Sequence, residues 1–215
     1  MTSSETRPLL DVPGGASDGD FNPGSAAGVI GAILVVPRLI GFGIAYAIYT
    51  WGNTALYDKK IALLGTYQLG YLYFAAVVFN AMVAFINVSP MYYKSKVMKQ
   101  DAGNLRANMF IYKDVETKKH VVMEDEGAVG EYNRANRSMT HFTENSIGVL
   151  FCILLSGYVY TFPVFILTIL FALGRVIHQV GYASGYGSHA PGFMLHMIGS
   201  VSVEMLALLA GIKSM

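Results

Sequence analysis

Five long apolar stretches constrain this chain more than any other feature. They span residues 27–51, 64–88, 139–159, 162–184 and 192–212. Each is close to the ~20 residues that a helix needs to cross ~30 Å of hydrocarbon. Backbone polar groups cannot stay unpaired in lipid, so each stretch is expected to form a helix. The sequence therefore predicts an all-α integral membrane protein with five crossings.

The composition supports this assignment. Charged residues make up 13% of the chain, about half of the ~25% that is usual in soluble domains. This argues against a soluble enzyme and against a disordered chain. The 15 basic residues barely exceed the 14 acidic ones, so nucleic acid is not expected as a partner. The single cysteine, Cys152, excludes an internal disulfide and is expected to act as a small hydrophobic residue.

Two polar segments lie outside these stretches. Residues 1–26 are rich in Gly, Ser, Asp and Pro, and predict a flexible cytoplasmic tail rather than a signal peptide. Within it, Glu5 precedes Leu9-Leu10 as in an acidic dileucine sorting signal, although chance in a low-complexity tail is the favoured explanation of this spacing. Residues 89–137 form the second segment, where 109–112 and 120–123 predict a small β-hairpin.

The basic residues predict the orientation. Ten of them fall on the side of the tail and the long loop, namely Arg7, Lys94, Lys96, Lys99, Arg106, Lys113, Lys118, Lys119, Arg134 and Arg137. The opposite side has Lys59, Lys60 and Lys213. The tail and loop are therefore expected in the cytoplasm, at an endoplasmic reticulum or an endosomal or vacuolar membrane. The sequons at Asn87 and Asn136 would then carry no glycan.

Ionisable residues follow one face of the third predicted helix. Arg134, Arg137, His141 and Glu144 are spaced by 3, 4 and 3 residues, and so fall within an arc of about 80°. Charged groups at membrane depth are costly and often functional, so this face is a candidate binding stripe. The alternative is a pair of arginines that reach for the interface beside one internal ion pair.

The fourth predicted helix carries a second polar face, with Arg175, His178, Tyr182 and Tyr186. Arg175 and Glu144 are expected at similar depth on helices joined by a tight turn, and so are predicted to form a structural ion pair. Two more charges, Arg38 and Glu204, lie in the middle of the first and last apolar stretches. They either pair with each other or face a polar cavity.

These faces suit a small polyanionic ligand that carries an amine, and glutathione has this chemistry. Arginine binds carboxylates through two parallel hydrogen bonds, and Glu144 could accept the ammonium group. A donor near the sulfur would favour the thiolate and so create a nucleophile. No metal is expected, because the five histidines lack the close spacing of metal ligands.

Two motifs resemble those of the MAPEG family, the membrane-associated proteins of eicosanoid and glutathione metabolism. They are Arg134-x2-Arg137-x3-His141-x2-Glu144 and Gly174-Arg175-Val176-x-His178-x3-Tyr182, and the resemblance covers about 65–212. It implies a four-helix bundle that forms a homotrimer and binds glutathione between subunits. Residues 64–212 would then be the MAPEG-like domain, and 27–51 an extra N-terminal transmembrane helix.

By this resemblance, Arg137 and Tyr182 match residues that contact glutathione, Glu144 matches the acid of the same helix, and Arg175 matches an arginine that pairs with that acid. His141 stands where Asn is usual, and His178 where Tyr or His occurs. The family's enzymes also place a thiol-activating arginine near the start of the last helix, but residues 187–192 contain none. His189 or Ser188 is the candidate catalytic donor in its place.

Three functions follow from these observations. The leading one is a glutathione-dependent transferase or peroxidase that acts on lipophilic electrophiles or lipid hydroperoxides. The alternative is a non-enzymatic lipid-binding scaffold or an accessory subunit of a membrane complex, which the extra helix and the missing arginine favour. An ion or proton transporter is the third, although the chain has no inverted repeat of the kind many transporters use.

Overall fold

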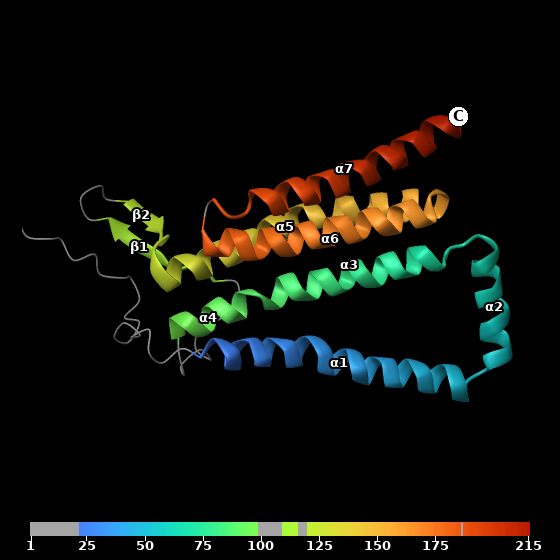
Figure 1. The fold of residues 1–215 in the computed structure, drawn as a ribbon, viewed down its shortest axis with the longest axis horizontal. Helices are drawn as coiled ribbons and strands as arrows, with labels where there is room; N and C mark the ends of the chain where they lie inside the picture. The colour runs from blue at the N-terminus through green and yellow to red at the C-terminus, as the bar shows by residue number, and fades with distance from the viewer. Residues whose placement is uncertain (1–21, 99–108, 116–119, 186) are drawn as a thin grey trace, which may run out of the picture.

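The computed structural model describes residues 22–98, 109–115, 120–185 and 187–215 (Figure 1). The elements in chain order are α1 (Pro23–Trp51), α2 (Thr54–Thr66), α3 (Gly70–Val88), α4 (Pro90–Met98), β1 (Tyr112–Val115), β2 (His120–Met123), α5 (Gly127–Val159), α6 (Thr161–Ser184) and α7 (Ala190–Lys213). The predicted all-α class with five long apolar helices is confirmed. The dileucine-like segment lies outside the described residues.

Helix α1 begins at Pro23, four residues before the predicted start. The side chain of Asn22 accepts a hydrogen bond from the backbone N–H of Ser25 at 3.1 Å. Proline in the first turn has no N–H that would need a partner. The side-chain cap of Asn22 and the proline at position 23 together favour a helix that begins within the segment predicted to be a tail.

The second predicted crossing is divided into α2 and α3. Gln68, between them, has a φ of 54°, which is incompatible with continuation of a right-handed helix. Helix α2 therefore ends at Thr66, and α3 begins at Gly70 rather than at residue 64. In Figure 1, α2 runs between the end of α1 and the start of α3, at the end of the molecule opposite the hairpin.

The long polar loop is shorter than predicted, because both of its ends are helical. Helix α4 follows α3 directly, and α5 begins at Gly127, twelve residues before the third apolar stretch at 139–159. The predicted hairpin is present, with Tyr112 opposite Met123 in an antiparallel pair. Its first strand begins at Tyr112 rather than at Met109.

Side chains of α5 explain this shift of the strand. The amide of Asn133 binds both backbone groups of Ile111, and the amide of Asn136 donates to the carbonyl of Met109 at 3.0 Å. Met109 and Ile111 therefore bond to α5, and across the hairpin Ile111 keeps one backbone bond, because its carbonyl accepts from the N–H of Glu124 at 3.0 Å. The first turns of α5 anchor the hairpin to the bundle.

The bundle itself contains α3, α5, α6 and α7, with α6 in contact with each of the other three. Phe79 of α3, Phe142 of α5 and Phe171 of α6 meet in its core, and each is at most 7% exposed. The rings of Phe79 and Phe171 stack with centroids 6.2 Å apart. These contacts fix α3 and α5 on neighbouring sides of α6.

Helices α6 and α7 approach each other backbone to backbone. A β-carbon on Gly174 would lie 2.3 Å from the backbone nitrogen of His196. Small residues permit this separation in membrane helices. The close approach brings the polar residues of α6 and α7 into one cluster.

Helix α1 differs from the other four long helices because none of its residues is buried. It contacts α2, α3 and α4, and lies along the edge of the fold farthest from α7 (Figure 1). All five long helices are long and apolar enough to cross a membrane. The chain is thus a multi-pass membrane protein with a four-helix core and an additional N-terminal helix.

Candidate functional site

A cavity of about 490 Å³ lies among α5, α6 and α7. Its lining combines apolar side chains with polar and ionisable ones. The polar and ionisable members are His141, Asn145, Ser146, Arg175, His196, Ser200 and Glu204, and the lining also includes Cys152. The cavity is therefore chemically suited to a ligand with both a charged and an apolar part.

Arg175 is the most deeply buried charged residue of this cavity, at 2% exposure. Its Nη2 atom donates a hydrogen bond to the carbonyl of Ser138 on α5 at 3.2 Å. Its guanidinium lies over the ring of Phe142 at 5.3 Å, and its Nη1 is 3.5 Å from Nε2 of His196. The Nε atom of Arg175 is buried and has no hydrogen-bond partner.

Four histidines form one group of neighbouring rings beside this arginine, and we call them the histidine cluster: His141, His178, His189 and His196. The His178 ring is central, with centroid distances of 6.3 Å to His141, 5.5 Å to His189 and 5.5 Å to His196. Its Nδ1 atom lies 3.1 Å from the hydroxyl of Ser138. Three separate helices thus place imidazoles within one site.

Tyr182 extends the cluster towards the start of α7. Its ring stacks on His178 at 5.6 Å and meets His189 edge-on at 5.2 Å. The structure therefore brings together four of the predicted site residues: His141, His178, Tyr182 and His189. Ser188, the other candidate donor, is exposed in the turn before α7.

His196 is not among the predicted site residues, yet it belongs to the cluster. Its ring lies 5.1 Å from that of Phe193, and both residues line the cavity. The signal was present in the sequence, because His189, Phe193 and His196 are spaced by 4 and 3 residues along one helix face. It was missed because a lone histidine on an apolar helix is usually a packing residue.

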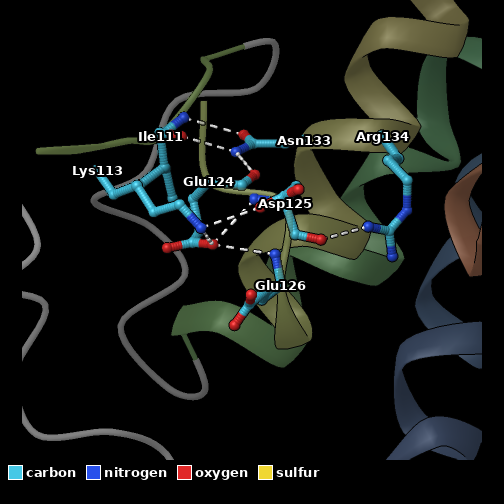
Figure 2. A network of polar contacts seen from close by, with 7 residues as sticks. All are labelled: Ile111, Lys113, Glu124, Asp125, Glu126, Asn133 and Arg134. Atoms are coloured by element: carbon cyan, nitrogen blue, oxygen red, sulfur yellow. Dashed lines mark hydrogen bonds and ion pairs between the residues drawn. The ribbon is translucent and has the colours of Figure 1, made fainter. Parts of the chain in front are cut away.

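The predicted stripe of α5 divides into a buried and an exposed part. Arg134 is 9% exposed and donates to the backbone carbonyl of Ala183 at 3.1 Å. It also donates to the backbone carbonyl of Asp125 at 2.6 Å (Figure 2). Arg137 and Glu144 remain about half exposed and form an ion pair at 3.5 Å. Arg134 therefore holds helices and hairpin together, while Arg137 and Glu144 are accessible.

The predicted ion pair between Arg175 and Glu144 is not formed within the chain. Glu144 pairs with Arg137 instead, and Arg175 bonds to Ser138. The reason is helical geometry: Phe142, which packs under Arg175, is two residues from Glu144, and so points about 200° away from it around α5. Phe142 and Glu144 therefore leave α5 on nearly opposite sides, and Arg175 packs on the side of Phe142.

A second polar network joins the hairpin to α5, as Figure 2 shows. Lys113 forms ion pairs with Glu124 at 2.9 Å and with Asp125 at 3.0 Å. Hydrogen bonds to Glu124 and then to Asp125 raise the pKa of Lys113. The hydrogen bond from Lys113 is also the main cause that lowers the pKa of Asp125. This network is structural and lies outside the cavity.

Within the described ranges, no group of three or more His, Cys, Asp or Glu side chains is arranged to hold a metal ion. The histidine cluster is instead bonded to Ser138 and Arg175 and surrounded by aromatic rings.

The five apolar helices and the four-helix core define a helical multi-pass membrane protein, with a cavity inside the core that is lined by both polar and apolar side chains. The chain belongs to the MAPEG family, which it matches over residues 64–212. The match covers α3, α5, α6 and α7 and leaves α1 outside. Neither a curated protein nor a solved structure matches the chain.

Proposed function

We propose that this protein binds glutathione and acts as a membrane-bound transferase or peroxidase on lipophilic electrophiles or lipid hydroperoxides. One observation carries the proposal. The Nε atom of Arg175 and the Nδ1 atom of His141 are both buried, lack hydrogen-bond partners, and belong to residues that line the cavity. Buried polar groups are nearly always paired, so a polar ligand that pairs with them is the simplest explanation.

The charged groups suit the three ionic groups of glutathione. Arg175 and Arg137 are the candidates for its two carboxylates, because a guanidinium binds a carboxylate with two hydrogen bonds. Glu144 is the candidate for the ammonium group, and its ion pair with Arg137 would open to admit the ligand. Both groups of this pair are accessible, with 47% and 54% of their side chains exposed.

The thiol requires a donor that favours its ionised form. His189 and Tyr182 are the candidates, since their rings lie 5.2 Å apart beside His178 and the Nδ1 atom of His189 is buried without a partner. A hydrogen bond to sulfur stabilises the thiolate, which then attacks the electrophile. Ser188 is a weaker candidate because the described geometry places it outside the cluster.

The apolar part of the cavity is the candidate site for the second substrate. Phe171, Val149 and Val201 line the same cavity as Arg175. A lipophilic electrophile dissolved in the bilayer would contact these side chains and present its reactive carbon or peroxide to the sulfur. Membrane lipids are therefore proposed as both surroundings and source of the substrate.

The test is binding of glutathione to the purified protein. Calorimetry measures the affinity, and ultraviolet difference absorbance detects the thiolate. We expect a thiolate signal for the wild type and a loss of affinity of at least about tenfold for Arg137→Ala, as removal of one charge-assisted hydrogen bond implies. Lys60→Ala, on the exposed helix α2, is the matched control. Absence of both binding and thiolate signal in the wild type would overturn the proposal.

A second function is favoured by one observation: α1 adds an exposed helix to the MAPEG core. The chain would then be a lipid-binding scaffold or an accessory subunit of a membrane complex. This alternative predicts a partner that survives gentle detergent extraction, and cellular function that is intact in Arg137→Ala. The enzyme predicts loss of function in the same variant.

We also propose that the side with the hairpin faces the cytoplasm, at the endoplasmic reticulum or an endosomal or vacuolar membrane, and that the chain forms a homotrimer or joins a partner membrane protein. The described cations support the orientation, with Lys94, Lys96 and Lys113 on the hairpin side. Asn136 is fully buried, which argues independently against a glycan at that position. Labelling of Lys94→Cys and Lys59→Cys from each side of intact vesicles tests the orientation.

A further inference from the structure

Helix α1 carries one charge in the middle of an otherwise apolar span. Arg38 is exposed, and its Nη1 atom donates to the carbonyl of Leu34 within the same helix. No carboxylate pairs with it in the part of the chain that the structure describes. An arginine at this depth in lipid is costly unless it meets a counter-charge or water. Arg38 therefore requires a partner from outside α1.

Helix α7 presents the complementary charge. Glu204 lies in the middle of that helix, is exposed, and forms part of the cavity lining. Arg175 lines the same cavity, but its described partners are Ser138 and His196. Among the described residues, no cation pairs with Glu204.

The two charges lie at matching depth. The alternation of crossings places the first residues of α1 and α7 on the same side of the membrane, the side of the hairpin. Arg38 is the 16th residue of α1, and Glu204 is the 15th residue of α7. At about 1.5 Å per residue, both therefore lie about 21–23 Å along their helices.

Each charge is also centred on an exposed apolar face. Val35 and Phe42 flank Arg38 by one turn on each side, at 53% and 72% exposure. Val201 and Leu208 flank Glu204 in the same way on α7, at 42% and 54% exposure. Residues three and four apart share a helix face. Each helix therefore has an exposed apolar face with one charge at its centre, positive on α1 and negative on α7.

These faces do not meet within one chain. Helix α1 packs on α2, α3 and α4, whereas α7 packs on α5 and α6. Figure 1 shows α1 and α7 at opposite edges of the fold, with α3 and α6 between them. A contact between two different faces at opposite edges of a protein joins copies head to tail, and closes into a ring where the rotation permits.

We propose that α1 of one copy docks on α7 of a second copy, and that Arg38 of the first pairs with Glu204 of the second. The pair neutralises both intramembrane charges and brings the two apolar faces together. It also adds a guanidinium to the mouth of the cavity, so that the cavity of each copy is completed by its neighbour. This assembly is independent of glutathione and can be tested without it.

The first test is cross-linking between copies. Arg38→Cys and Glu204→Cys are placed in separate, differently tagged chains that both carry Cys152→Ala, and the chains are co-expressed and treated in membranes with a short thiol-reactive cross-linker. We expect a dimer that contains both tags. Ile40→Cys is the matched control: it is also exposed but points about 200° away around α1, and should give at least about tenfold less product.

The second test is charge reversal in full-length protein reconstituted alone into vesicles, with the number of copies per assembly measured by stepwise photobleaching. Arg38→Glu or Glu204→Arg alone should reduce the assembled fraction several-fold, and the double reversal should restore it. Three results would overturn the proposal: no mixed cross-link, a cross-link within one chain that carries both cysteines, or assembly only when another membrane protein is present. The cross-link remains informative if a reversed variant fails to insert.

Discussion

Gly192 of α7 lies directly against the backbone of His178 of α6: a β-carbon on Gly192 would lie 2.3 Å from the His178 nitrogen. Together with Gly174 against His196, this contact fixes the separation of the two helices. The rings of the histidine cluster meet because the backbones of α6 and α7 are this close. The geometry of the histidine cluster thus depends on two glycines, Gly174 and Gly192.

The first prediction concerns this contact. Gly192→Ala should destabilise the protein by about 1–3 kcal/mol, the usual cost of overpacking, because the obstructing atom is backbone and cannot move aside. The measurement is the midpoint of thermal unfolding in detergent. Gly211→Ala on the same helix is the control, since nothing lies within 4 Å of its added carbon. Equal midpoints for the two variants would contradict the packing described.

The second prediction concerns Asn133, which is fully buried and anchors the hairpin by hydrogen bonds to Ile111 and Glu124 (Figure 2). Asn133→Leu removes the partner of the Ile111 N–H and of the Glu124 carbonyl, at a cost of about 1–3 kcal/mol for each that stays buried, whereas the Ile111 carbonyl keeps its bond from the Glu124 N–H. We expect much faster proteolysis within residues 109–126. Thr143→Val, which removes a bond only within α5, is the control and should cleave at the wild-type rate.

The third prediction is the pH dependence of the hairpin. The pKa of Asp125 is lowered from its ordinary 3.8 by the hydrogen bond from Lys113, so its contribution is complete above pH 3.8 and is lost as the pH falls through the lowered value. The pKa of Lys113 is raised from 10.5, so its contribution is complete below pH 10.5 and is lost above that. Hairpin order should be constant between these limits.

The mobility of a spin label at the exposed position 121, in a Val121→Cys, Cys152→Ala protein, reports this dependence. It should rise at the acidic and alkaline ends. Asp125→Asn has no titrating carboxylate at this position and should weaken the acidic change. An unchanged acidic limb in this variant would show that Asp125 is not responsible.

The fourth prediction rests on the proposed function. His141 stands where the family resemblance expects asparagine, and its Nδ1 atom is buried without a partner. His141→Asn keeps a donor and an acceptor, and should bind glutathione within a few-fold of the wild type. His141→Leu should bind about tenfold more weakly, which corresponds to ~1.4 kcal/mol. Calorimetry that found both variants equal to the wild type would remove His141 from the site.

The membrane class and the number of crossings could be predicted from hydropathy, because length and apolarity alone decide whether a helix can span lipid. The ends of the helices could not. Helix α5 begins at Gly127 because its first turns bond the hairpin, and α3 is separated from α2 by the positive φ of Gln68. Both effects depend on where other segments lie.

The candidate site shows the same division. Helical periodicity placed His178 and Tyr182 on one face of α6 and Arg137 and Glu144 on one face of α5, and the structure agrees. Periodicity within a helix gives no information about which neighbour that face meets. Arg175 therefore bonds to Ser138 rather than to Glu144.

What the sequence determined alone was thus local and periodic: five membrane helices, their polar faces and the motifs of the MAPEG family. The tertiary structure decided which faces meet, because contacts between helices depend on rotation and separation, which small residues such as Gly174 and Gly192 set. It gathered the rings of His141, His189 and His196 around His178, beside the buried Arg175. It also placed Arg38 and Glu204 at opposite edges of the fold, where the two charges do not pair within one chain.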